Sequence, residues 1–158
     1  MTSDTRPLAI VTGASAGIGY ELAKCCAEQG FDLLVAADQL AIRDAAEAFR
    51  TLGAAVEAIE ADLATLDGVD RLYAAAKGRP IEALLANAGH GLGHGFLDQN
   101  FDDVRHIIDT NITGTLYLIQ KVGREMRARK HGQDLLYLSG EFSRLIATHP
   151  QAVACHGP

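Results

Sequence analysis

A glycine-rich segment near the start of the chain carries the clearest chemical signal. Residues 12–19 read Thr-Gly-Ala-Ser-Ala-Gly-Ile-Gly and lie between a short apolar stretch and an amphipathic one. Glycines at a strand-to-helix turn let the backbone approach a pyrophosphate, because no Cβ stands in the way. The start of the next helix offers free N–H groups and a partial positive charge to phosphate oxygens. The segment therefore predicts a phosphate-bearing ligand, with a plain tight turn as the alternative.

Three further motifs follow in order along the chain. Asp62-Leu63 follows the third expected strand, Asn87-Ala88-Gly89 follows the fourth, and Asn111 lies within a long expected helix. Together with the Gly-x-x-x-Gly-x-Gly spacing of the first loop, these motifs resemble the short-chain dehydrogenase/reductase family over residues 8 to about 131. The resemblance implies that nine residues bind the cofactor: Gly13, Ser15, Ile18, Gly19, Asp38, Asp62, Leu63, Asn87 and Gly89.

The same resemblance implies a reaction and two catalytic residues. It is hydride transfer between NAD(P) and a small-molecule alcohol or carbonyl. Asn111 would position a water in the proton relay, and Ser139 would polarise the substrate oxygen. A polar Asn inside a helix is otherwise unfavourable, which supports a special role for Asn111. The alternative is an ordinary solvent-exposed Asn, which a helix tolerates at modest cost.

The resemblance fails toward the end of the chain. The family places a Tyr-x-x-x-Lys pair about a dozen residues after the serine, and the Lys lowers the pKa of the acid/base Tyr. The matching positions here are Ala154 and Pro158, and the match is lost after about Gly132. We therefore expect a truncated or frame-disrupted member that binds NAD(P) and is inactive. The alternative is a non-catalytic nucleotide-binding or regulatory module, or a non-functional fragment.

Asp38 at the end of the second expected strand bears on the choice of cofactor. It lies about 20 residues past the last loop glycine, where a carboxylate binds the ribose 2′-hydroxyl of NAD and repels the 2′-phosphate of NADP. In the family the NAD-selecting acid usually lies one position earlier, which is Ala37 here. We expect NAD, with NADP left open. The alternative for Asp38 is an N-cap of the next helix.

Two of the six histidines, His90 and His94, lie four residues apart in a glycine-rich stretch. Metal sites need such spacing on a rigid element with a third ligand, and none is evident in the sequence. We therefore expect a flexible substrate-side loop and no metal site.

Apolar stretches alternate with helical patterns along the whole chain, which predicts right-handed crossovers and a parallel sheet. On the long last helix, an apolar stripe is expected to run from Val104 to Val122 through Ile108, Ile112 and Leu116. The fold class is α/β, a Rossmann-type doubly wound parallel sheet in one domain over residues 1–158. It is incomplete, with about five strands, and lacks the family's last strands. Strands are expected at 7–12, 32–37, 54–60, 81–86 and 134–138, and helices at 17–29, 39–52, 66–77 and 102 to about 129.

Composition excludes several classes of partner. The formal net charge is −6 and the basic residues form no long run, which argues against nucleic acid as a partner. The apolar stretch at residues 8–11 is too short for a signal peptide or a membrane span. We therefore expect a cytoplasmic protein without a membrane partner. A homo-oligomer stays open, since the sequence does not settle the oligomeric state.

Overall fold

The computed structural model describes residues 6–93 and 95–129. Its strands are all parallel, and their spatial order is β3-β2-β1-β4. β1 therefore lies between β2 and β4, and the strand order reverses beside it. At a reversal of this kind the connections leave in opposite directions and open a crevice at the carboxyl ends of the strands. The strands are β1 (Leu8–Thr12), β2 (Asp32–Ala37), β3 (Val56–Glu60) and β4 (Ile81–Leu85).

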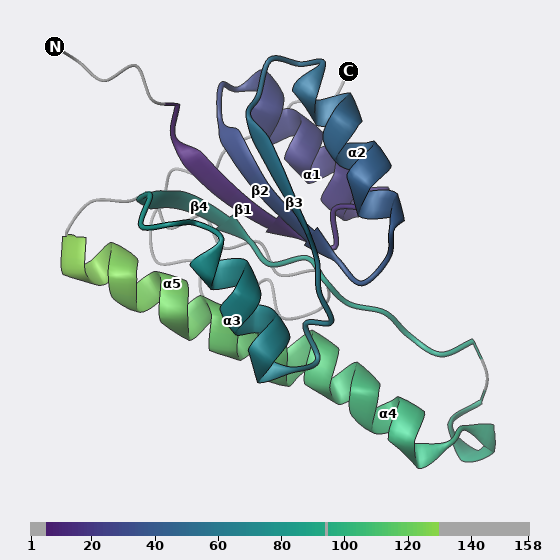
Figure 1. Cartoon of the computed structure of the whole chain (residues 1–158). Helices are drawn as coiled ribbons and strands as arrows, with labels where there is room; N and C mark the ends of the chain where they lie inside the picture. Colours follow the sequence, from purple (N-terminus) through teal and green to yellow (C-terminus); the bar gives the residue numbers. More distant parts are fainter. Residues whose placement is uncertain (1–5, 94, 130–158) are drawn as a thin grey trace, which may run out of the picture.

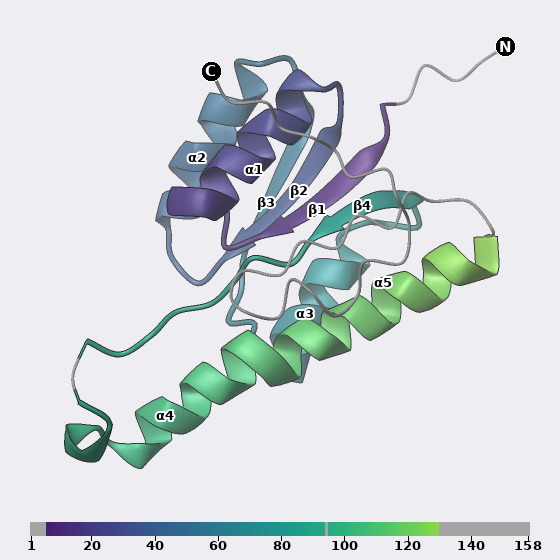
Figure 2. The same cartoon turned by 180° about the vertical axis from the view of Figure 1, so that it is seen from behind.

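Helices cover both faces of this sheet (Figures 1 and 2). α1 (Gly17–Glu28) and α2 (Ala41–Arg50) lie on one face, and α3 (Leu66–Ala74) and α5 (Thr115–Arg129) lie on the other. α4 (Phe101–Ile108) runs into α5 through the π-helical turn η2 (Asp109–Gly114), and the short helix η1 (Phe96–Asp98) precedes α4. The described residues thus confirm the doubly wound Rossmann-type fold.

The central strands are buried on both faces, as parallel strands between two helix layers should be. Val11 of β1 packs with Phe49 against the α1 and α2 layer. Its neighbour Ile10 packs with Leu72 and Val122 against the α3 and α5 layer. Because successive strand side chains point to opposite faces of the sheet, the protein has two separate hydrophobic cores, one on each face. Both cores hold the carboxyl ends of the strands in place.

The apolar stripe expected along the last helix is wrong in its middle. Ile108, Ile112 and Leu116 are 45%, 43% and 52% exposed. Val122 is buried as expected, and the other buried side chains of α5 are Leu118 and Met126, which pack with residues of α3. The π turn inserts an additional residue and rotates the residues after it onto a different face, so a regular helical period does not carry through it. The expected strand at 134–138 lies outside the described residues.

Candidate nucleotide-binding site

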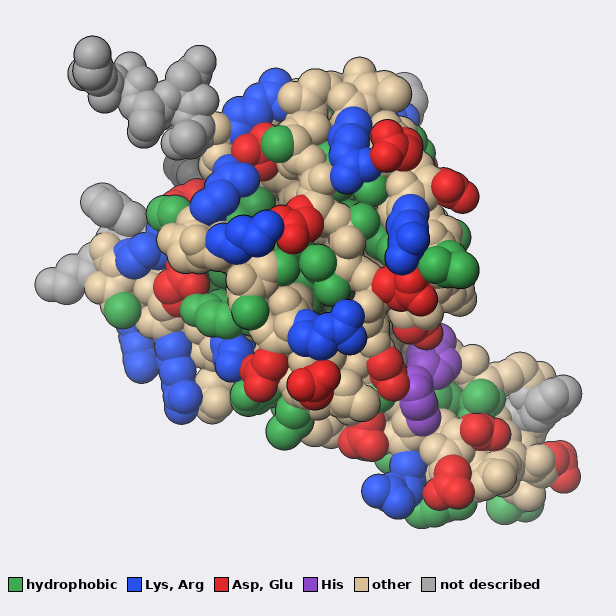
Figure 3. Space-filling model, in the orientation of Figure 1, with side chains coloured by type: hydrophobic (Ala, Val, Ile, Leu, Met, Phe, Trp, Pro, Cys, Tyr) green, Lys and Arg blue, Asp and Glu red, His purple; other side chains and the backbone are tan. Residues whose placement is uncertain are grey.

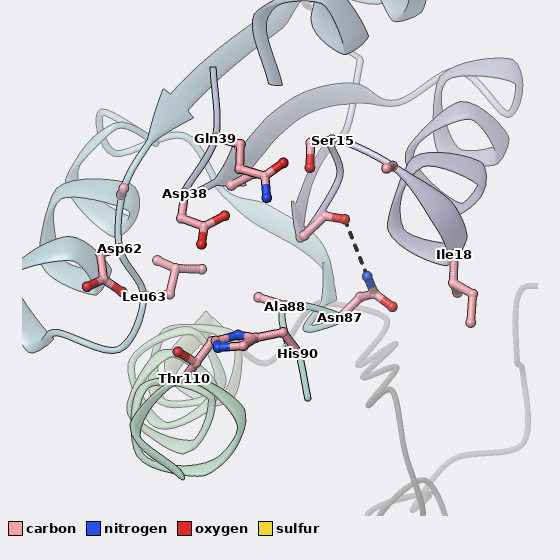
Figure 4. Close-up of a pocket in the computed structure, with 15 residues that line it drawn as sticks. Ser15, Ile18, Asp38, Gln39, Asp62, Leu63, Asn87, Ala88, His90 and Thr110 are labelled. Atoms are coloured by element: carbon pink, nitrogen blue, oxygen red, sulfur yellow. Dashed lines mark hydrogen bonds between the residues drawn. The ribbon is translucent and has the colours of Figure 1, made fainter. Parts of the chain in front are cut away.

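A cavity of about 540 Å³ opens at the carboxyl ends of the strands (Figure 4). Residues that follow each of the four strands line it, so the pocket lies where the topology predicts a ligand. Eight of the nine residues expected to bind the cofactor line the cavity: Gly13, Ser15, Ile18, Asp38, Asp62, Leu63, Asn87 and Gly89. The sequence did not indicate that His90 and Thr110 would line it as well.

The ninth residue, Gly19, lies behind the wall of the cavity on α1. A Cβ built on it would be 2.1 Å from the carbonyl oxygen of Gly13 and 2.5 Å from Nδ2 of Asn87. Only a glycine permits this close approach between the first turn of α1 and the end of β1. Gly13 itself has a φ of +67°, a conformation that a Cβ disfavours. The loop is therefore built around glycine at two positions, for two different reasons.

The N-terminus of α1 is left without a side-chain cap. Its N-cap residue is Ala16, which makes no capping hydrogen bond, whereas Thr65 caps α3 and Asn100 caps α4. The first turn of α1 also contains no acidic residue. The N–H groups of that turn are orphan donors next to the cavity, and an anion is their natural acceptor.

Thr12 at the end of β1 fastens this strand to the segment after β4, a role that the sequence did not reveal. Its hydroxyl accepts hydrogen bonds from the backbone N–H of Asn87 at 3.0 Å and of Ala88 at 2.9 Å. The side chain of Asn87 in turn donates to the carbonyl of Gly13 at 3.4 Å (Figure 4). The glycine loop and the segment after β4 therefore keep a fixed separation across the crevice.

Asp38 directs its carboxylate into the cavity from the end of β2 (Figure 4). The interpretation of Asp38 as the N-cap of the next helix is wrong, because α2 starts at Ala41 and Leu40 occupies the N-cap position. Among the described residues, no Lys or Arg lines the cavity. The carboxylate therefore makes this part of the pocket negatively charged.

Asn111 lies in the π turn and holds the backbone of His90 from both sides. Its Nδ2 donates to the His90 carbonyl at 3.0 Å, and its Oδ1 accepts from the His90 N–H at 3.1 Å. Asn111 is solvent-exposed, as the alternative interpretation expected, and its amide also makes these two hydrogen bonds. Asn111 does not line the cavity itself. It fixes the segment after β4 that does, and the π turn directs its amide there.

The remaining catalytic position, Ser139, lies outside the described residues, as do Ala154 and Pro158.

A Tyr-x-x-x-Lys spacing does occur within the described residues, on α5, where the sequence interpretation did not note one. Lys121 Nζ is 3.3 Å from the Tyr117 hydroxyl and 2.7 Å from Oδ1 of Asp70 on α3. Neither Tyr117 nor Lys121 lines the cavity. This pair fastens α5 to α3.

The contact between Lys121 and Asp70 should make the stability of the fold depend on pH, and this dependence can be measured. Hydrogen bonds from Lys121 and Tyr117 lower the pKa of Asp70, and the bond to Asp70 raises the pKa of Lys121. A lowered carboxyl pKa stabilises the fold above its unfolded value of about 4, and this stabilisation is lost as the pH falls through the folded pKa. Lys121→Met should therefore lower the Tm near neutral pH.

We expect the Tm difference between wild type and Lys121→Met to shrink below a pH of about 4, since Asp70 is then protonated in the unfolded chain. Thermal unfolding followed by circular dichroism across this range measures it. The matched control is Arg124→Met, at an exposed position of the same helix. A Lys121→Met effect that is the same at all pH values would contradict the ion-pair explanation.

The described residues contain no group of three or more metal-binding side chains. None of their helices is long and apolar enough to cross a membrane.

Comparison with known proteins agrees with this geometry. A family model described as short chain dehydrogenase matches residues 7–136. The chain is 30% identical over 149 residues to an NADP-dependent mannitol dehydrogenase from Hypocrea jecorina, covering 90% of this chain and 55% of that protein. It is 31% identical over 137 residues to an L-rhamnose 1-dehydrogenase (NAD(P)(+)) from Azotobacter vinelandii, covering 82% and 54%.

A solved structure has the same fold. It is a bulky-bulky ketone specific alcohol dehydrogenase from Comamonas testosteroni, with a TM-score of 0.75 and 26% identity over 82% of this chain and 53% of that one. The chain spans about half of the length of the relatives that it matches. Because the family model covers most of its residues and the strand order and glycine loop agree with it, the chain belongs to the short chain dehydrogenase family.

Proposed function

We propose that this chain is the dinucleotide-binding part of an oxidoreductase that transfers hydride between NAD(P) and a small alcohol or carbonyl compound. The cavity at the carboxyl ends of the strands supports the proposal most strongly, because an uncapped helix N-terminus, a glycine cradle and a carboxylate all line or border it. When bound, the nicotinamide would supply or accept the hydride. The residues of this chain would hold the dinucleotide and fix the segment after β4 that lies beside it.

Two residues have proposed roles in the reaction. Asn111 would position a water in the proton relay, as the family resemblance implies, while its two hydrogen bonds keep the backbone of His90 in place. Ser139 would polarise the substrate oxygen, as the family resemblance implies.

We further propose that the chain binds a dinucleotide without turnover, since Ala154 and Pro158 occupy the positions at which the family resemblance places the acid/base pair. Fluorescence titration with NADH and NADPH, followed by turnover assays on a panel of alcohols and ketones, tests this. Binding without turnover favours this proposal and also fits a regulatory module. Turnover above background would overturn the inactivity, and a failure to bind either dinucleotide would favour a non-functional fragment.

The preferred cofactor is proposed to be NAD. A carboxylate at position 38 accepts hydrogen bonds from ribose hydroxyls and repels a 2′-phosphate. The relatives include proteins named as NADP-dependent and as NAD(P)-dependent, so membership of the family does not by itself decide between NAD and NADP.

Asp38→Asn is the variant that tests this preference. It removes the charge and keeps the size of the side chain, so we expect NADPH to bind about tenfold more tightly, with a small loss for NADH. Fluorescence titrations with both dinucleotides measure the ratio. Asp44→Asn removes an exposed carboxylate of α2 that does not line the cavity and serves as the matched control. An unchanged NADH-to-NADPH ratio in Asp38→Asn would rule out Asp38 as the selecting residue.

Two further properties stay predictions. Exposed apolar side chains on α4, η2 and α5, including Ile108, Ile112 and Leu116, support a homo-oligomer, which light scattering would detect. A cytoplasmic location is also a prediction, and microscopy of a tagged chain would test it.

A further inference from the structure

β3 is the outermost strand at one end of the described sheet, where it pairs only with β2. Its residues are half-buried or exposed, whereas every residue of β1 and β2 is buried. Figure 1 shows β3 between α2 and α3, and Figure 3 shows basic and acidic side chains interspersed over the same face. An outer strand of this kind has backbone groups without a partner in the sheet, and a strand of another molecule can pair with them.

Alternate residues of β3 direct their backbone groups away from β2. At the two ends of the strand, Ala55 accepts a backbone hydrogen bond from β2 at 2.8 Å, and Ala61 donates one to β2 at 3.0 Å. Successive residues of a paired strand turn their backbone groups to opposite sides. The N–H and C=O groups of Val56, Ala58 and Glu60 therefore point to the outer edge.

Two arginines occupy two of these outward carbonyls. Nη2 of Arg50, at the end of α2, donates to the carbonyl of Val56 at 2.6 Å. Nη2 of Arg71, on α3, donates to the carbonyl of Glu60 at 3.3 Å. A further hydrogen bond, to the carboxylate of Glu47, holds the guanidinium of Arg50 in this position. Because α2 and α3 lie on opposite faces of the sheet, the two side chains reach opposite ends of the edge from opposite sides.

A groove beside the edge leaves room for an added strand. It lies between α2 and β3, and Ala46, Val56 and Ala58 line it together with four charged residues. Side chains of an approaching strand would lie over these small residues, so the shape of the surface does not close the edge. The two arginine hydrogen bonds do, because they occupy the acceptors that the strand would need.

The strand that fits these blocked positions is β3 of a second copy of the chain. In an antiparallel pair centred on Ala58, this residue would lie opposite its counterpart, and Val56 would lie opposite Glu60 of the second copy. Between them, Glu57 would lie opposite Ile59, so no two carboxylates would face each other. The outer hydrogen bonds of this pairing would need the carbonyls of Val56 and Glu60, which the arginines occupy.

We propose that Arg50 and Arg71 keep the outer edge of β3 closed and so prevent two copies of this chain from joining their sheets through this strand. The proposal goes beyond the proposed function and does not depend on dinucleotide binding. Arg43 of α2 offers a built-in comparison at the same edge. It contacts the carboxylate of Glu60, at 3.6 Å, rather than a backbone carbonyl.

Removing both arginine contacts from the full chain tests the proposal. The double variant Arg50→Met/Arg71→Met keeps the aliphatic part of each side chain and frees the two carbonyls. We expect it to self-associate about tenfold more tightly than wild type, since pairing of two copies regains backbone hydrogen bonds at both ends of β3. Sedimentation velocity over a concentration series gives the association constant. Hydrogen–deuterium exchange should show new protection of residues 54–61 as the concentration rises.

Two controls identify the cause of any association. Arg43→Met removes a positive charge from the same edge without freeing a carbonyl, and it should associate as wild type does. The chain has a net charge of −6, so the loss of two arginines increases the repulsion between copies and does not by itself promote association. Adding Ala58→Pro to the double variant removes the outward N–H at the centre of the edge and should restore wild-type behaviour.

Three results would overturn the proposal. They are a double variant that associates no more tightly than wild type, an equal increase in Arg43→Met, and association that persists after Ala58→Pro is added. If the double variant fails to fold, wild type itself decides by exchange. Residues 54–61 that gain protection as the wild-type concentration rises would mean that the edge is open and paired, whereas concentration-independent exchange supports closure. A chain that binds no dinucleotide would leave this proposal standing.

Discussion

Gly19→Ala is expected to weaken NADH binding by about a hundredfold and to lower the free energy of unfolding by about 3 kcal/mol. The added methyl group would lie 2.1 Å from the carbonyl oxygen of Gly13 and 2.7 Å from its carbonyl carbon. Both are backbone atoms, so no side-chain rotation relieves the overlap. The first turn of α1 has to move away from the end of β1, and its N–H groups lose their alignment with the phosphates.

Gly123→Ala is the matched control for this substitution. Gly123 is an exposed residue of α5, and a Cβ there would meet no atom within 4 Å. Alanine in an open helical position should raise the free energy of unfolding by about 0.5–1 kcal/mol and leave NADH binding unchanged. Urea denaturation and fluorescence titration of both variants give the two quantities. A Gly19→Ala protein with wild-type affinity would mean that the α1 N-terminus does not hold the ligand.

The order of the elements could be predicted from the sequence because β1, β2 and β4 are short and largely buried apolar stretches, whereas β3 alternates charged and apolar residues. Leu33, Leu34 and Val35 of β2 are almost fully buried, so their side chains had to be apolar whatever the local propensity. The strand ends then bring residues as far apart as Gly13, Asp62 and Asn87 into one cavity. The topology of the sheet alone brings these distant residues together, and sequence patterns specify topology well in alternating α/β folds.

The contacts that hold the site together were not predictable in the same way. In the π turn at Asp109–Gly114, Asn111 bonds to the backbone of His90, a contact between residues 21 positions apart. The pairing of His106 with Asp62 likewise depends on how α4 packs beside the end of β3. Neither residue type nor spacing indicates such contacts, because they are set by the tertiary arrangement of elements that are distant in sequence. For the same reason, the Tyr117 and Lys121 spacing resembles a catalytic motif but faces α3.

Thr12→Val should lower the free energy of unfolding by about 2–4 kcal/mol, which urea denaturation would measure. Valine keeps the shape of the side chain and removes the hydroxyl that accepts from the N–H groups of Asn87 and Ala88. The side chain at position 12 is almost fully buried, at 2% exposure, so water cannot easily replace the lost acceptor. Two donors are then left unsatisfied, and each costs about 1–3 kcal/mol, partly relieved by local movement.

Thr12→Ser separates the hydroxyl from the methyl group. Serine retains the acceptor and loses one methyl, so its cost should stay near 1 kcal/mol and NADH binding should persist. In Thr12→Val, by contrast, the segment after β4 loses its attachment to β1, and the cavity wall formed by Asn87, Ala88 and Gly89 should shift. NADH affinity should therefore fall together with stability. A Thr12→Val protein with wild-type stability, beside a destabilised Thr12→Ser protein, would show that packing of the methyl group, and not the shared acceptor, holds the two strand ends at the distance that the ligand needs.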